Sequence, residues 1–165
     1  MIFETERLRI RYLTLKDLNS FHKMQSNPKV MQFADGEVDT FEGHRKELIT
    51  LINKYEIENN DFWIYAIERK IDEKFLGTLA LIKDGDDDEI GYRFLEEYWN
   101  QGYGKEVCKA TLEYCKQKGM QQLVAYCIDA NVASTKILKG LNFESVEKLT
   151  FDNQQFSETK YKIQL

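Results

Sequence analysis

One stretch of sequence, Glu89 to Ala110, constrains the fold of this chain more than any other. Apolar residues at alternate positions, ending at Phe94, are typical of a half-buried strand. Gly102 and Gly104 then mark a tight turn, and the apolar residues that follow recur at helical spacing. The segment therefore predicts a strand, a glycine turn and a helix in direct succession.

A turn of this kind can bind an anion, because glycine lets the backbone come close to a ligand and the first amides of a helix are unpaired. A diphosphate is the expected ligand. The alternative, that the glycines serve only turn geometry or packing, stays open, since the segment matches neither a Walker A loop nor a full G-x-G-x-x-G motif. The candidate phosphate-binding residues are Gln101, Gly102, Tyr103, Gly104 and Lys105.

Composition indicates one globular domain over residues 1–165, with 42% hydrophobic and 31% charged residues. No apolar run approaches the roughly 20 residues of a membrane span, and the first ten residues lack a secretory pattern. We therefore expect a cytoplasmic protein without a membrane partner. The net charge of -5 argues against nucleic acid and is compatible with cationic amines.

The three cysteines, Cys108, Cys115 and Cys127, lack disulfide or zinc spacing and are expected in the core. The acidic run from Asp84 to Glu89 lacks the spacing of an EF-hand loop, so no metal site is predicted. A solvated acidic turn that attracts cationic amines is the favoured interpretation.

Elements alternate along the chain without a linker. Two capping boxes, Thr14 with Asp17 and Asp39 with Glu42, predict helix starts. The predicted order is a strand at Phe3–Leu13, a helix from Thr14 until Asn27-Pro28, a helix from Asp39 through Tyr55, strands at Phe62–Arg69 and Phe75–Lys83, the central strand and helix ending at Lys118-Gly119, a strand at Leu123–Ile128, a helix at Asn131–Lys139, and strands at Phe143–Phe151 and Phe156–Ile163 around Asp152-Asn153.

This order resembles the GNAT-superfamily N-acetyltransferases, and within them the RimJ/RimL branch of ribosomal-protein N-terminal acetyltransferases. Five segments carry the resemblance over almost the whole chain: ETERLRIR, NPKVMQF, FLGTL, EIGYRFLEEYWNQGYGKE and NVAST. It implies an α/β fold with a mixed, mostly antiparallel sheet, helices on both faces and a splayed cofactor groove. The chain departs from the superfamily signature at Trp99, where arginine or glutamine is usual, and at Asn142, which takes the place of a glycine and can still adopt a left-handed turn.

The resemblance also implies acetyl-CoA as cosubstrate. It suggests that the strand edge at Tyr92, Arg93 and Phe94 accompanies the pantetheine arm, and that the Phe94 amide faces the thioester oxygen. Asn131 would contact pantetheine or an ordered water, and Ser134 would lie near the thioester sulfur. The alternative for both is local helix capping.

The tyrosine that many superfamily members use to protonate the thiolate is replaced here by Leu138, which leaves Ser134 as the hydroxyl donor. An amine with a pKa of ~8 to ~10.4 also needs a base. Glu89 is the first candidate, with a solvated strand-end charge as the alternative. His22 and His44 are left unassigned.

These observations favour an acetyl-CoA-dependent acyltransferase that acetylates a primary amine, with a protein N-terminal α-amine as the leading acceptor. Polyamines, aminoglycoside-like amines and a non-catalytic CoA-binding module are the alternatives. The oligomeric state, monomer or homodimer, is left open.

Overall fold

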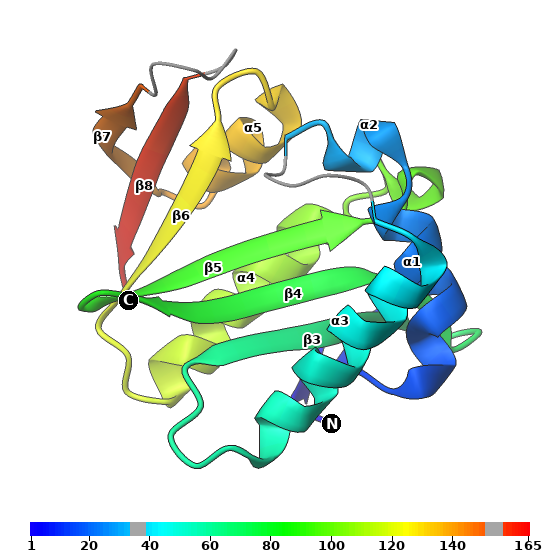
Figure 1. Ribbon diagram of the computed structural model, residues 1–165. Helices are drawn as coiled ribbons and strands as arrows, with labels where there is room; N and C mark the ends of the chain where they lie inside the picture. Colours follow the sequence, from blue (N-terminus) through cyan, green and yellow to red (C-terminus); the bar gives the residue numbers. More distant parts are fainter. Residues whose placement is uncertain (34–38, 151–156) are drawn as a thin grey trace.

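The computed structural model describes residues 1–33, 39–150 and 157–165. Within them, eight strands form one sheet in the order β1-β2-β3-β4-β5-β6-β8-β7 (Figure 1). The strands are β1 (Phe3–Glu4), β2 (Leu8–Tyr12), β3 (Phe62–Arg69), β4 (Lys74–Asp84), β5 (Asp87–Phe94), β6 (Gln122–Ile128), β7 (Glu144–Leu149) and β8 (Glu158–Gln164). The helices are α1 (Leu18–Gln25), α2 (Pro28–Met31), α3 (Phe41–Asn53), α4 (Tyr103–Gln117) and α5 (Val132–Gly140), with 3-10 turns at Leu15–Asp17, Lys54–Glu56 and Glu96–Tyr98.

The sheet opens between β5 and β6. All neighbouring strands pair antiparallel except these two, which run parallel and share the single register pair Glu89↔Val124. Beyond that pair the two strands diverge, so that β6, β8 and β7 lean away from the rest of the sheet (Figure 1). The predicted mixed sheet with a splayed groove is confirmed.

Helices cover both faces of the sheet, as expected. α4 packs on one face, and α1 and α3 pack on the other (Figure 1). Side chains alternate along each strand, so β5 sends Ile90, Tyr92 and Phe94 toward α4, while Arg93 lies on the opposite face against Gln25 of α1. Side chains of β5 therefore contact the helices on both faces of the sheet.

A bulge in β4 lies directly beside the end of β5. Ile67 pairs with Gly77 and the next residue of β3 pairs with Phe75, so Leu76 is the extra residue. A Cβ on Gly77 would lie 1.9 Å from the carbonyl oxygen of Arg93. Only glycine fits this approach, which explains the glycine in the FLGTL segment.

Several local predictions are confirmed. β3 has the predicted bounds, Gly119 ends α4 with φ +82°, and Asn142 adopts φ +66° in the left-handed region. All three cysteines are buried and free. Short polar residues tolerate this region of backbone space, which is why Asn142 can replace glycine.

Other predictions need correction. The strand predicted at Phe3–Leu13 is broken into β1 and β2, because the Thr5 side chain accepts a hydrogen bond from the Leu8 N–H and closes a turn there. The cap of α3 is Thr40, which binds the Gly43 N–H at 3.0 Å, rather than Asp39.

The acidic run contains a turn, as predicted, and this turn closes a tight hairpin between β4 and β5. Asp84 pairs with Asp87 across a two-residue turn that contains Gly85 at φ +58°. The predicted Asp152-Asn153 turn lies outside the described residues, although β7 and β8 do pair antiparallel as the last two strands.

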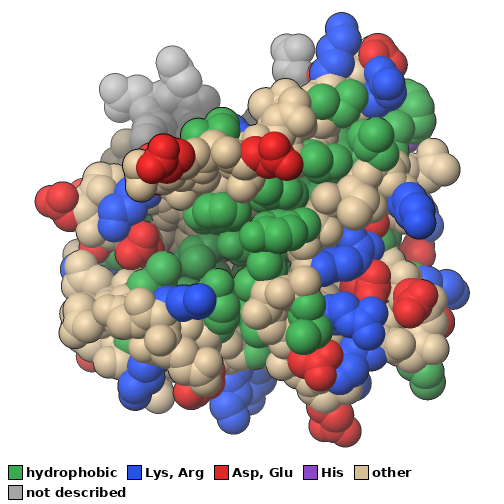
Figure 2. All heavy atoms as spheres, turned by 90° about the horizontal axis from the view of Figure 1, so that it is seen from below, with side chains coloured by type: hydrophobic (Ala, Val, Ile, Leu, Met, Phe, Trp, Pro, Cys, Tyr) green, Lys and Arg blue, Asp and Glu red, His purple; other side chains and the backbone are tan. Residues whose placement is uncertain are grey.

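The face shown in Figure 2 has hydrophobic side chains across its middle, and Lys/Arg and Asp/Glu side chains lie interspersed around them. It therefore carries no uniform basic field of the kind that binds nucleic acid. Among the described helices, none is both long and apolar enough to span a bilayer.

Candidate active site

The backbone of β5 faces the opening between the two halves of the sheet. The Leu95 N–H donates to the Leu76 carbonyl of β4 at 2.9 Å. Because backbone groups alternate in direction along a strand, the N–H and C=O of Phe94 and Tyr92 point away from β4. The Phe94 carbonyl accepts a hydrogen bond from the Trp99 indole at 3.0 Å. The Phe94 N–H thus points away from β4 toward the opening, and its role as an oxyanion donor stays a prediction.

Trp99 also has a structural explanation. Its indole ties the approach to the glycine turn to the end of β5, which is a reason for tryptophan at the position where the superfamily signature has arginine or glutamine.

Arg93 lies differently from its two neighbours. Its backbone pairs with Thr78 of β4, and its side chain donates to Gln25, which in turn donates to Glu47 at 3.2 Å. Burial lowers the pKa of the Arg93 guanidinium. The predicted contact between Arg93 and the cofactor therefore gains no support from its position.

The glycine turn leads directly into α4. Gly102 is the N-cap residue at φ +82° and supplies no capping side chain. The first intrahelical hydrogen bond is from Glu106 N–H to Gly102 C=O at 3.1 Å, so the amides of Tyr103, Gly104 and Lys105 precede the helical ladder. Uncapped amides at the positive end of a 15-residue helix match the chemistry of a diphosphate.

The two glycines are needed for different reasons. Gly102 supplies the left-handed conformation. A Cβ on Gly104 would lie 3.0 Å from Ile137 Cδ1 and 3.5 Å from Tyr92 Cε2, so this glycine lets α4 pack closely against α5 and β5. The packing explanation left open by the sequence thus holds for Gly104. Gln101 and Lys105 are exposed at the turn, while the ring of Tyr103 is buried, so Tyr103 can offer a ligand only its backbone.

The Ser134 side chain of α5 contacts a side chain of β5, on the other side of the opening. Asn131 caps α5 by accepting from the Ser134 N–H at 3.2 Å, which is the capping arrangement the sequence left open. The Ser134 Oγ lies 3.2 Å from the Tyr92 hydroxyl. Burial raises the pKa of Tyr92, so its phenol stays protonated at neutral pH.

Sequence reasoning missed the Tyr92 side chain, having assigned that residue only a backbone contact. Leu138, where a tyrosine was sought, is 2% exposed and belongs to the core. A phenol nevertheless reaches Ser134, from β5 instead of α5. Alternation along β5 places Tyr92 on the α4 face, but the proximity to Ser134 depends on how α5 docks.

Glu89 sits at the closed end of the opening, where β5 and β6 still pair. Burial raises the pKa of its carboxyl to about 7, with further increases from the charges of Asp84 and Glu158 and an opposing effect of Lys160. Asp84 itself accepts from the Tyr126 hydroxyl at 2.5 Å. Glu89 can therefore exchange a proton near neutral pH, as a general base requires.

The two histidines bind each other. The Nδ1 atoms of His22 on α1 and His44 on α3 lie 2.8 Å apart, and the Ser26 hydroxyl lies 3.1 Å from His22. This pair joins the two helices, and we assign it no catalytic role.

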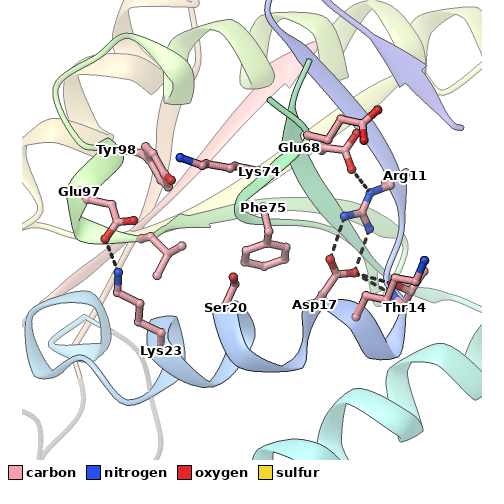
Figure 3. A pocket seen from close by; sticks show the side chains of 13 residues that line it. Arg11, Thr14, Asp17, Ser20, Lys23, Glu68, Lys74, Phe75, Glu97 and Tyr98 are labelled. Atoms are coloured by element: carbon pink, nitrogen blue, oxygen red, sulfur yellow. Dashed lines mark hydrogen bonds and ion pairs between the residues drawn. The ribbon is translucent and has the colours of Figure 1, made fainter. Parts of the chain in front are cut away.

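A cavity of about 650 Å³ lies beside α1 rather than at the opening. Figure 3 shows Arg11 paired with Asp17 and Glu68 at one end and Lys23 paired with Glu97 at the other. Its charged groups largely satisfy one another, and none of the predicted site residues lines it. We therefore place the candidate active site at the opening between β5 and β6.

Comparison with known proteins identifies the class. A family described as "Acetyltransferase (GNAT) domain" matches residues 7–144. The chain belongs to this family of acetyl-CoA-dependent N-acetyltransferases, and within it to the RimJ/RimL type.

Solved structures share the fold. A GNAT-family acetyltransferase from Bacillus anthracis superposes with a TM-score of 0.85 at 24% identity, covering 98% of this chain and 96% of that one. An acetyltransferase from Salmonella typhimurium that modifies the N-terminal serine of ribosomal protein L7/L12 gives 0.80 at 17%, covering 98% and 96%. A spermidine N-acetyltransferase from Vibrio cholerae, in complex with CoA and spermine, gives 0.80 at 17%, covering 97% and 96%.

Proposed function

We propose that this N-acetyltransferase acts on a protein N-terminal α-amine. The observation that carries the proposal is the position of Glu89, the candidate base, where β5 and β6 meet at the closed end of the opening, together with the burial that raises the pKa of its carboxyl to about 7. An α-amine has a pKa of ~8, so its proton moves to such a base at a cost of roughly 1.4 kcal/mol. For a lysine-type amine of pKa ~10.4 the cost rises to roughly 4.6 kcal/mol. The lower pKa of the α-amine thus reduces the cost of deprotonation by about 3.2 kcal/mol whichever base accepts the proton, and a base of pKa about 7 keeps that cost small.

We assign each residue of the opening a separate role in binding or catalysis. Acetyl-CoA supplies the acetyl group as a thioester. The amides of residues 103–105 bind the diphosphate, and Glu89 takes the proton of the attacking amine. The Phe94 N–H stabilises the charge that develops on the carbonyl oxygen. Ser134, oriented by the Tyr92 hydroxyl, donates a hydrogen bond to the departing sulfur. Attack is direct, with amine and cofactor bound together.

A small polyamine is the second candidate acceptor. The net charge of -5 is compatible with a cationic substrate, and the charges of Asp84 and Glu158 act on Glu89 against the opposing charge of Lys160. The spermidine enzyme from Vibrio cholerae shows that the same fold serves such amines. Fold similarity alone does not choose between the two classes.

The test compares matched amines at pH 7.5. Release of the CoA thiol is measured with a lysine-free peptide that begins with serine, with the same peptide N-acetylated and carrying one lysine, and with spermidine. We expect kcat/KM for the free α-amine to exceed the other two by tenfold or more. A calorimetric titration with acetyl-CoA accompanies the assay.

Faster turnover of spermidine or of the lysine peptide would reassign the acceptor. Acetyl-CoA binding without amine-dependent thiol release from any substrate would support a CoA-binding module instead of an enzyme acting on these amines.

A further inference from the structure

An arginine from a distant part of the chain contacts the glycine turn and the start of α4. Arg7, in the turn between β1 and β2, donates from Nη1 to the Gln101 carbonyl at 3.1 Å. Its Nε and Nη2 reach Glu106 Oε2 at 2.7 and 2.6 Å. The guanidinium also lies 4.4 Å from the centre of the Tyr103 ring. A single side chain therefore contacts the residue before Gly102, the residue after it and the first turn of α4.

The ion pair between Arg7 and Glu106 affects the charge near the proposed diphosphate site. A carboxylate in the first turn of α4 stabilises the helix but repels a bound diphosphate. The Thr5 hydroxyl donates to Glu106 Oε1 at 2.5 Å and the Arg7 N–H donates to it at 3.2 Å. Burial opposes ionisation of Glu106, yet the hydrogen bonds from Thr5 and Arg7 outweigh it and lower its pKa. The carboxylate thus stays charged, and Arg7 neutralises it.

Further ring contacts extend from Arg7 to the end of β5, which borders the groove. The Tyr103 ring, with Arg7 on one side, stacks against the Phe94 ring at 6.5 Å between centroids. Arg7, Tyr103 and Phe94 therefore connect the β1–β2 hairpin through the start of α4 to the end of β5. The planar guanidinium suits this geometry, since it can form a fork of hydrogen bonds and stack at the same time.

We propose that Arg7 is a positioning residue for the diphosphate of acetyl-CoA. It acts through Gln101, Tyr103 and Glu106, by fixing the left-handed turn at Gly102 and by cancelling the one carboxylate charge in the first turn of α4. This inference rests on the proposed function, because it assumes that the diphosphate binds at this turn.

The test measures steady-state kinetics of Arg7→Met with two thioesters. Acetyl-CoA carries the diphosphate, and S-acetylpantetheine lacks it. We expect the KM for acetyl-CoA to rise about tenfold, with less than a twofold change for S-acetylpantetheine and little change in kcat. The matched control is Arg45→Met, since Arg45 is similarly exposed (47% against 43%) and pairs with Glu42 on α3. It should leave both KM values unchanged.

Two further variants separate positioning from general stability. Arg7→Lys keeps the charge but loses the fork, and should give an intermediate KM. Adding Glu106→Gln to Arg7→Met removes the uncompensated carboxylate and should recover part of the affinity for acetyl-CoA. Thermal unfolding of each variant reports any loss of fold.

Equal losses with both thioesters, or an unchanged KM for acetyl-CoA in Arg7→Met, would overturn the inference while leaving the proposed function intact. Failure of the unaltered protein to bind acetyl-CoA would overturn both.

Discussion

Replacing Glu89 with glutamine should stabilise this protein at alkaline pH while it removes the base. The carboxyl pKa is raised from 4.5 to about 7, chiefly by burial. At about 1.4 kcal/mol per tenfold, this difference corresponds to roughly 3 kcal/mol. Because the group is only partly buried, solvent screening reduces the expected effect to about 1–2 kcal/mol.

The pH dependence follows from the sign of the change. A carboxyl whose pKa is raised on folding stabilises the folded state below the unfolded value, near 4.5, and this stability is lost as the pH rises through about 7. Wild type and Glu89→Gln should therefore unfold alike near pH 4.5. At pH 8 the variant should unfold at a temperature about 2–8 °C higher, given roughly 2–4 °C per kcal/mol for a chain of this size.

Activity should change in the opposite direction. The kcat/KM of wild type should rise with an apparent pKa near 7, and Glu89→Gln should lose about 100-fold at pH 8 together with that inflection. The control is Glu144→Gln, at an exposed carboxylate on β7. A variant that keeps the inflection, or whose stabilisation is the same at pH 4.5 and pH 8, would refute the reasoning.

Two further substitutions test the groove and the sheet. Tyr92→Phe removes the hydroxyl 3.2 Å from Ser134, and should lower kcat about three- to tenfold while calorimetry finds unchanged acetyl-CoA affinity; weakened binding would contradict a role through Ser134. Gly77→Ala forces a Cβ against the Arg93 carbonyl and should cost about 3 kcal/mol in urea unfolding, whereas Gly140→Ala, with open space around it, should cost nothing. Equal stability of the two alanine variants would show that β4 and β5 can move apart to accommodate a Cβ at residue 77 without cost, which would contradict the prediction.

Local chemistry made much of the fold predictable. Alternation identified β3, glycine identified the end of α4, and Asn142 was expected in the left-handed conformation that it adopts. Errors arose where a side chain competes with the regular backbone pattern. Thr5 breaks the first strand by binding the Leu8 N–H, and Thr40 rather than Asp39 caps α3.

The site was predictable to the extent that it is contiguous in sequence. The strand, glycine turn and helix from Glu89 onward appear as predicted, because apolar alternation, turn glycines and helical spacing are all readable within one short segment. Arg93 could not be distinguished from Tyr92 and Phe94, since the direction of each backbone amide depends on the pairing of β5 with β4.

The sequence by itself determined the order of the elements, the uncapped start of α4 and the family, because these depend on residues close together in the chain. Only the tertiary structure decided which groups meet. The contact of Tyr92 with Ser134, 42 residues apart, and that of Arg7 with Glu106, 99 residues apart, arise from the docking of α5 and of the β1–β2 hairpin. The pKa of Glu89 likewise depends on burial and on charges from β4 and β8. These effects act through space, so no local pattern encodes them.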